Sequence, residues 1–162
     1  MTMPNGRVYD GNWKKGVPDG RGKEKTEAGD QYEGDFKQGK RFGNGKLTTV
    51  GGNSYEGQWW ESMPHGEGTE TIPGVQTYTG NFLGGQRQGK GKITFPDKST
   101  LECDFVDGLP TGKGKLIHVN GEVYEGGFKK GVREGKGKLT QPGGTSYEGD
   151  FMKGLPHGSG VY

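Results

Sequence analysis

The sequence predicts an all-β protein: a single, elongated, twisted antiparallel sheet, built as a solenoid-like rod from seven β-hairpin repeats. Two observations lead to this fold. A tyrosine recurs every 23 residues from Tyr9 to Tyr147 without insertion, and Leu101 is its one replacement. A Trp or Phe follows each of these seven anchors four residues later. A strict period of this length is typical of repeat arrays, in which each copy packs on its neighbours.

The first half of each copy reads as a strand. With the anchor counted as position 1, positions 1 to 5 alternate between aromatic or small residues and polar ones, the pattern of a strand with one apolar face. Position 3 is glycine in six copies and Cys103 in the fifth. We expect these strands at residues 9–13, 32–36, 55–59, 78–82, 101–105, 124–128 and 147–151.

The second half of each copy reads as the returning strand of a hairpin. Six residues, with glycine at position 8 in six copies, predict a hairpin loop. Positions 12 and 14 are always glycine, and they alternate with basic or polar residues. We expect returning strands at residues 20–24, 43–47, 66–70, 89–93, 112–116, 135–139 and 158–162. Turns rich in Pro and Gly link the copies, and the absence of a 3.6-residue apolar period predicts no helix.

A register that pairs position 5 with position 12 sets the two faces of this sheet. One face carries the aromatic rings, with glycines at positions 3, 12 and 14 leaving room for them. The other face carries opposite charges across each hairpin, worth roughly 0.2–1 kcal/mol a pair. The expected pairs are Asp10–Lys23, Glu33–Lys46, Glu102–Lys115, Asp104–Lys113 and Glu125–Lys138. Position 10 alternates between Pro and Arg, which predicts different surroundings for odd and even loops.

Composition excludes several classes of protein. Only 26% of the 162 residues are apolar and 36 are glycine, which alone would favour disorder, but the fixed period argues against it. A net charge of +2 gives no support to nucleic-acid binding. The lone Cys103 rules out an internal disulfide and fits a reducing compartment. With no long apolar run and no signal-peptide pattern, we predict a cytoplasmic protein.

The residues of Tyr32 to Lys46, YEGDFKQGKRFGNGK, resemble the MORN repeat (membrane occupation and recognition nexus), whose pattern is similar to YEGxWxxGxxHGxG. The resemblance covers essentially the whole chain as one array, with copies that start near residues 9, 32, 55, 78, 101, 124 and 147. The chain begins and ends in phase with the repeat, so we expect it to be part of a longer array. The resemblance implies a scaffold rather than an enzyme.

No motif predicts catalysis, a cofactor or a resident metal. His65 and His157 share loop position 11 and His118 follows a returning strand, but none has the ligand spacing of a zinc site. A metal that bridges two chains through a histidine or Cys103 stays open. MORN arrays are similar to those attached to SET-type lysine methyltransferases and phosphatidylinositol phosphate kinases, but no residue here matches either catalytic domain.

We predict a non-catalytic scaffold, or protein-interaction module, of a cytoskeletal or membrane-proximal assembly. Its partner would bind along the aromatic and glycine face, or by adding a strand at an edge. The alternative for the same rings is that they only pack between repeats. The residues of the expected partner groove are Tyr32, Trp59, Trp60, Tyr78, Phe82 and Tyr124.

A second hypothesis is a peripheral membrane module that binds phosphoinositide headgroups. In the expected register Lys90, Lys92 and Lys136 face no acid, so positive charge collects in copies four to six. The residues of this basic patch are Arg87, Lys90, Lys92, Lys113, Arg133 and Lys136.

The last strand offers an open edge, and open edges tend to pair. We therefore predict an antiparallel homodimer, in agreement with what the family resemblance implies. The residues of this edge are Phe151, Leu155, Val161 and Tyr162.

Overall fold

The computed structural model describes residues 1–3 and 5–161, and the described chain is all strand and turn, with no helix. The chain divides into two compact units, Met1–Gln86 and Arg87–Tyr162. The first unit holds β1 (Val8–Lys14), β2 (Val17–Lys25), β3 (Gln31–Lys37), β4 (Lys40–Thr48), β5 (Ser54–Trp60), β6 (Met63–Ile72) and β7 (Gln76–Leu83). From Gln86 onward follow β8 (Gln86–Thr94), β9 (Thr100–Val106), β10 (Leu109–Ile117), β11 (Val123–Lys129), β12 (Val132–Thr140), β13 (Ser146–Met152) and β14 (Leu155–Val161).

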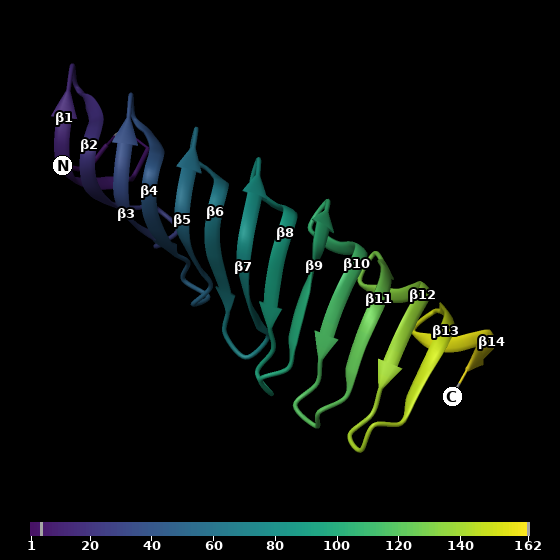
Figure 1. Cartoon of the computed structure of the whole chain (residues 1–162). Coiled ribbons are helices and arrows are strands. Elements are labelled where there is room, and N and C mark those ends of the chain that lie inside the picture. Colours follow the sequence, from purple (N-terminus) through teal and green to yellow (C-terminus); the bar gives the residue numbers. More distant parts are fainter. Residues whose placement is uncertain (4, 162) are drawn as a thin grey trace. The chain divides into compact units, whose positions relative to one another are not determined.

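The strands form an antiparallel, unclosed sheet in which the strand order is the order of the chain. This confirms the predicted all-β hairpin array. Within each unit, the short hairpin turns lie along one edge of the sheet and the longer connections lie along the other (Figure 1). We call these the turn edge and the connection edge.

The hairpins have a different register near their turns from the one expected. Tyr9 faces Glu24 and Gly11 faces Gly22, as predicted for positions 1 and 3. Trp13 then faces Pro18, so position 5 pairs with position 10 and a bulge absorbs the difference. The predicted six-residue loop is therefore wrong, because the strands continue to a two-residue turn.

The geometry of this turn explains why the strands run on. Lys15 and Gly16 have φ angles of 51° and 80°, both in the left-handed region that a type I′ turn requires. All seven hairpins repeat it, with φ of 49–56° at position 7 and 66–85° at position 8. Such turns match the twist of the flanking strands, so the sheet needs no longer loop.

Glycine at position 12 allows the backbone conformation of the bulge. The prediction that it leaves room for the rings was wrong. Its φ lies between 64° and 100° in all seven copies, where a Cβ is strained. The side chain nearest to a Cβ added at Gly43 is that of Asp35, with a carboxylate oxygen at 2.7 Å. The ring contacts fall instead on the glycines at positions 3 and 14.

The aromatic residues form the core of the sheet as a chain of edge-to-face contacts. The Tyr32 ring lies 5.1 Å from Phe36 in its own copy and 5.2 Å from Trp59 in the next, at interplanar angles of 89° and 83°. Its hydroxyl donates to the carbonyl of Asp35 at 3.0 Å. A Cβ at Gly45 would overlap the Tyr32 hydroxyl, so the ring lies directly on backbone. Edge-to-face pairs contribute about 0.5–1.5 kcal/mol beyond their buried area.

The alternation at position 10 has a physical reason. In the second copy the Arg41 guanidinium lies over the Tyr32 and Trp59 rings, 4.9 and 5.6 Å from their centroids, and donates to Glu24 at 2.8 Å. Glu24 is buried and is also paired with Arg7. In the first copy the same position is the buried Pro18. In these two copies a packed proline is thus followed by an arginine between rings, in agreement with the predicted difference in surroundings.

Candidate functional site

Lysines and acids form ion pairs across neighbouring copies on the face opposite the rings. Lys23 Nζ lies 3.3 Å from a Glu33 carboxylate oxygen, and Lys46 lies 3.3 Å from Glu56. In the second unit Lys115 lies 2.6 Å from Glu125. This ion pair raises the pKa of Lys115 and lowers the pKa of Glu125, because the hydrogen bond between them favours both charged forms.

These ion pairs correct the pairs expected within hairpins. The lysine at position 15 faces an acid on both flanking strands, as Lys23 faces Asp10 and Glu33, and its ammonium group lies with the acid of the following copy. The same holds for Lys46 and Lys115, which pair with Glu56 and Glu125. The expected pair of Asp104 and Lys113 is not formed across the hairpin, because the bulge removes that stretch from direct opposition. Lys113 faces Gly127 on the other side.

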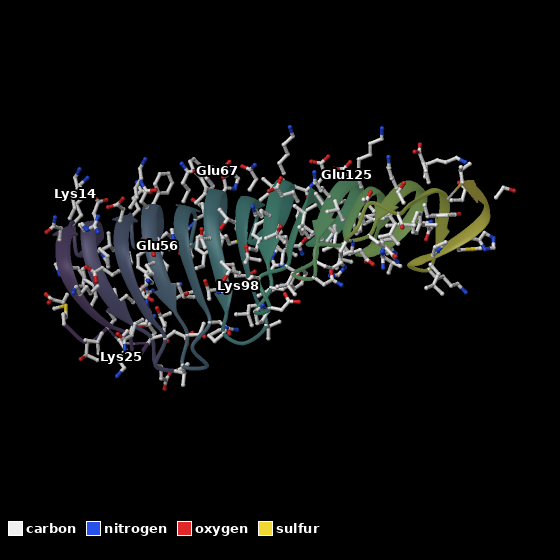
Figure 2. The ribbon with its side chains drawn as sticks, turned by 60° about the horizontal axis from the view of Figure 1, so that its bottom comes forward. Lys14, Lys25, Glu56, Glu67, Lys98 and Glu125 are labelled. Atoms are coloured by element: carbon white, nitrogen blue, oxygen red, sulfur yellow. The ribbon has the colours of Figure 1, made fainter. Side chains whose placement is uncertain are left out.

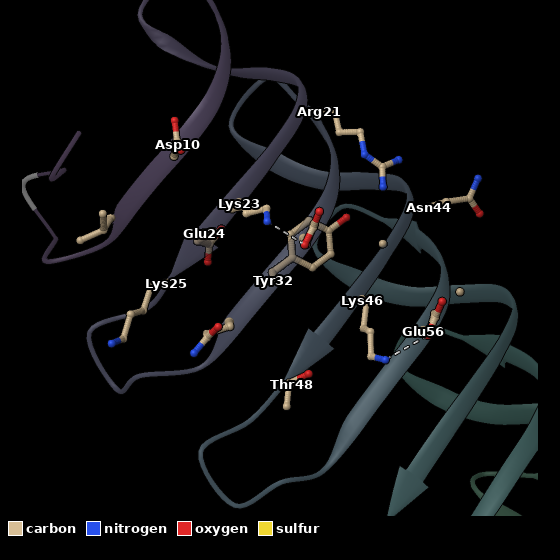
Figure 3. A pocket seen from close by; sticks show the side chains of 15 residues that line it. Asp10, Arg21, Lys23, Glu24, Lys25, Tyr32, Asn44, Lys46, Thr48 and Glu56 are labelled. Atoms are coloured by element: carbon tan, nitrogen blue, oxygen red, sulfur yellow. Dashed lines mark ion pairs between the residues drawn. The ribbon is translucent and has the colours of Figure 1, made fainter.

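An open hollow of about 760 Å³ lies within the first unit (Figure 3). Its walls include the ion pairs Lys23–Glu33 and Lys46–Glu56, which Figure 3 marks with dashed lines. Gly45 and Gly57 add bare backbone between these charges. The hollow therefore offers both signs of charge and exposed peptide groups at once.

The second unit holds a hollow of about 1140 Å³ with the same construction. Ion-paired Lys115 and Glu125 line it, and Gly126 and Gly137 lie among the charges. A second ion pair at this face joins Lys136 to Asp150 at 3.1 Å. In both hollows only backbone lies between the rows of charge, because residues at positions 3 and 14 point to the ring face, where a Cβ would meet the tyrosines.

The predicted aromatic groove does not form as expected. The rings are used in the core, where each packs against its neighbours, so they leave almost no surface for a partner. The structure thus supports the packing alternative for these side chains. The buried members are Tyr32, Trp59, Tyr78, Phe82 and Tyr124.

Trp60 differs from the other five residues of the predicted groove, since its side chain is 53% exposed. Its ring lies 4.7 Å from Phe42 and 6.4 Å from His65. Lys37 Nζ lies 5.0 Å from the centroid of Phe42. Trp60 lies at position 6, one residue after the ring of position 5, so it is not part of the buried row of rings. It lies instead in an exposed cluster with Phe42, His65 and Lys37.

The predicted basic patch is largely neutralised. Lys92 pairs with Glu102 at 2.9 Å and Lys136 pairs with Asp150, although the expected register left both lysines without acids. Arg133 lies 5.3 Å from the centroid of Tyr124, and its guanidinium is 3.9 Å from Glu122. Lys90 faces Asp104 on the next strand, and the backbone carbonyl of Arg87 accepts from Gly108. Lys113 and Lys90 are exposed.

The predicted dimer edge divides into two kinds of residue. Phe151 is buried among the aromatic rings, so the prediction that it contributes to the dimer edge was wrong. Leu155 and Val161 are 69% and 74% exposed on β14. Tyr162 lies outside the described residues.

Two features of the site escaped the sequence reasoning. The hollows depend on the pairing between copies, which composition does not specify. The buried Glu24 with Arg7 and Arg41 was also missed, although acids at position 16 of the first and third copies, Glu24 and Glu70, gave a signal. Each of these acids comes one copy before an arginine at position 10.

Burial raises the pKa of the Cys103 thiol. The described residues hold no group of three or more His, Cys, Asp or Glu placed to bind a metal ion. Nor does this part of the chain contain a helix that could cross a membrane.

Comparison with known proteins relates the chain to one family. No curated protein sequence matches it. Among solved structures, the SAS-4 (dCPAP) TCP domain of Drosophila melanogaster, in complex with a proline-rich motif of Ana2 (dSTIL), is 15% identical, with a TM-score of 0.37. That match covers 91% of this chain and 92% of the other, and its likeness is too low to carry an argument about partners.

The family comparison agrees with the hairpins copy by copy. The MORN repeat model matches residues 9–31, 32–54, 55–74, 78–100, 104–123, 124–146 and 147–162. These ranges span nearly all of the sheet, so the chain belongs to the MORN repeat family.

Proposed function

We propose that this protein is a non-catalytic interaction module that binds a protein segment in the glycine-floored hollows of its charged face. The observation that carries the proposal is the difference between the two faces of the sheet. The aromatic rings are buried in the core on one face, whereas the hollows on the other face present charged side chains and backbone to solvent. A scaffold role in a cytoskeletal or membrane-proximal assembly is part of the same proposal.

The ion pairs that line the first hollow are easily opened by a partner. The side chains of Lys23 and Glu33 are 69% and 54% exposed, and those of Lys46 and Glu56 are similar. Exposed ion pairs contribute about 0.2–1 kcal/mol each, so a partner can replace them at little cost. Side chains of the partner then gain charged contacts that fix its register.

This geometry favours a segment that carries both signs of charge. Lysines and acids alternate from strand to strand along the hollow, as Lys23, Glu33, Lys46 and Glu56 do. A segment of a single sign would meet like charges at every second position, which is unfavourable. Between the rows of charge the sheet presents only backbone, because the alternate residues point to the ring face, so a partner backbone can approach closely there.

The test is quantitative capture of binding proteins by the full chain and by the charge-reversal variant K23E/K46E. We expect proteins that the wild type captures to be lost by this variant. With a captured protein purified, affinity should fall about tenfold or more, because like charges then face the partner.

The matched control is K14E/K37E, which makes the same change of charge on the turn edge, outside the hollow. It should retain the captured proteins. If both variants capture the same set as the wild type, or lose the same set, the hollow is not the binding site.

A further inference from the structure

The two hollows differ in their balance of charge. Four basic and four acidic side chains line the first hollow, whereas four lysines and three acids line the second. The second hollow therefore has one lysine more than it has acids. Its lysines are Lys113, Lys115, Lys136 and Lys138.

Lys113 is the lysine in surplus. Lys115 and Lys136 are ion-paired with acids, and Lys138 faces acids on both flanking strands. Lys113 is exposed, and within the described part of the chain no acid lies within ion-pair distance of its ammonium group.

The repeat shows which group Lys113 lacks. A residue at position 13 faces position 4 of the following copy, so Lys136 faces Asp150 and pairs with it at 3.1 Å. Lys113 faces Gly127, which has no side chain. The ammonium group of Lys113 is therefore without the carboxylate that the next copy provides for Lys136.

The side chain at position 4 has a second role, at the bulge of its own hairpin. In the second copy the Asp35 carboxylate accepts a hydrogen bond from the backbone N–H of Asn44 at 3.0 Å. In the third copy a glutamine side chain accepts from the N–H of the same position at 2.9 Å. In the sixth copy this N–H belongs to Lys136, and Gly127 offers no side chain to accept it.

The space beside this bulge is open in the sixth copy. A Cβ placed at Gly43 would lie against the Asp35 carboxylate, whereas a Cβ at Gly135, the same position in the sixth copy, would meet no atom within 4 Å. A Cβ at Gly127 would meet the carbonyl oxygen of Glu134, so this backbone does not admit a side chain there. We call this space the niche. The residues that border it are Lys113, Gly127, Gly135 and Lys136.

We propose that the niche binds an aspartate or glutamate side chain of the protein segment held in the second hollow. The inference rests on the proposed function and adds the class of residue that such a segment must carry. The carboxylate accepts from the ammonium group of Lys113 and from the backbone N–H of Lys136, as Asp35 accepts from Asn44. Hydrogen bonds between ionised groups are the strong ones, so Lys113 determines which segments bind.

A carboxylate fits the niche better than a phosphate group. Glu125 precedes Gly127 by two residues on β11 and extends from this part of the sheet (Figure 2). Asp150 is also close, since it pairs with Lys136. A carboxylate carries one negative charge and balances the one lysine in surplus, whereas a phosphate group carries up to two and is repelled by both acids.

The experiment begins with selection from a library of random displayed peptides on the full chain carrying K23E/K46E, which disables the first hollow. Peptides that bind the second hollow are those lost when K115E is added. We expect these peptides to share an aspartate or glutamate at one fixed position.

The affinity of one such peptide then tests Lys113 directly. K113Q should lower the affinity about tenfold or more, the loss expected for one hydrogen bond between charged groups. Replacement of the acid in the peptide by its amide should cause a similar loss, and the two changes together should cause little more, because they remove the same contact. A peptide with phosphoserine in place of the acid should bind more weakly than the acidic one.

The matched control is K90Q. Lys90 is exposed at the same position of the fourth copy, but it faces Asp104 and does not line the hollow. This variant should bind the peptide as tightly as the host chain and should select peptides with the same acid.

The niche is rejected if the selected peptides share no acid at a fixed position, if K113Q and K90Q bind the peptide equally well, or if the phosphoserine peptide binds more tightly. Peptides that need Lys115 but not Lys113 would overturn this inference alone and leave the proposed function standing. If no selected peptide depends on Lys115, binding in the second hollow is refuted, and the niche with it.

Discussion

At the scale of single residues, two departures from the repeat explain each other. A Cβ at Gly34 would meet the Tyr32 hydroxyl as well as the backbone of Asn44 and Gly45 on the facing strand, so a tyrosine at position 1 disfavours any side chain at position 3. The fifth copy has Leu101 at position 1 and Cys103 at position 3. Leucine lacks the ring that would cover position 3, and the Cys103 thiol occupies that space, 3.6 Å from the carbonyl oxygen of Lys113.

We therefore expect strong coupling between these two positions. L101Y alone should lower the free energy of unfolding by about 1–3 kcal/mol, because the new ring overlaps the Cys103 side chain. In L101Y/C103G, which restores the consensus pair, most of this loss should be recovered. Urea unfolding of the wild type, both single variants and the double variant measures the coupling. Additive effects of the two changes would contradict the argument.

The buried tyrosines make stability sensitive to high pH. Burial raises the pKa of Tyr55 from the ordinary value of 10.0 to about 12, and it also raises the pKa values of Tyr9, Tyr32 and Tyr124. A raised pKa in the folded state means that stability is full below the unfolded value and is lost as pH rises through the folded one.

The free energy of unfolding should therefore fall as pH rises from 10.0 towards about 12. Tyrosinate absorbance and the circular dichroism of the sheet should change together in this range, because ionisation requires the rings to leave the core. Tyrosines that ionise near their ordinary pKa while the sheet stays intact would show that the rings are not buried in this way.

At the scale of the hairpin, the turn is the local feature that most constrains the sequence. Gly16 has a φ of 80° and open space around the place of a Cβ, so only the backbone conformation disfavours other residues there. G16A should lower the free energy of unfolding by roughly 1 kcal/mol. Thermal or urea unfolding checks this.

A suitable control for the turn is G51A. Gly51 lies in a connection, does not have a left-handed φ, and has only one distant neighbour at the place of a Cβ. This change should have almost no effect on stability. Equal losses in G16A and G51A would mean that the left-handed conformation is not the cause.

The sequence predicted the strands well and their ends poorly. The alternation of Tyr32, Gly34 and Phe36 determines which residues lie inside, and this is a local property. The bulge cannot be predicted from this local pattern. A glycine such as Gly43 can either allow a positive φ, as it does here, or leave room for a ring, and the sequence does not distinguish the two. Once the bulge shifts the register, the expected opposition of Asp104 and Lys113 disappears.

At the scale of the whole molecule, the charge pairs and hollows of the surface depend on contacts between neighbouring copies. Lys92 and Lys136 looked unpaired within their hairpins, and both pair with acids of the following copy. A prediction made inside one repeat could not find those partners. Trp60 was recognisable in advance because it interrupts the pattern, whereas the hollows required the complete sheet.

Self-association is the prediction that belongs to the molecule as a whole. Among the described residues no strand covers the outer side of β14, and Leu155 and Val161 are exposed on that strand. Because open edges tend to pair, we expect a two-fold dimer through β14. Light scattering should show a mass that doubles as concentration rises.

The variant L155K/V161K should remain monomeric over the same range, because like charges on an edge strand oppose pairing. Phe151 is unsuitable for this test, since it is buried and its replacement would disturb the core. A wild type that stays monomeric at high micromolar concentration would refute the dimer.

The alternation of proline and arginine at position 10 also limits how such an array can change its length. Arg41 needs the buried carboxylate of Glu24 from the copy before it, so neighbouring copies are not interchangeable. Loss of one copy would place two loops with the same residue at position 10 next to each other. A buried guanidinium or carboxylate would then lack its partner. Duplication or deletion of two adjacent copies would keep the alternation of proline and arginine intact. We therefore expect such arrays to gain or lose copies in pairs during evolution.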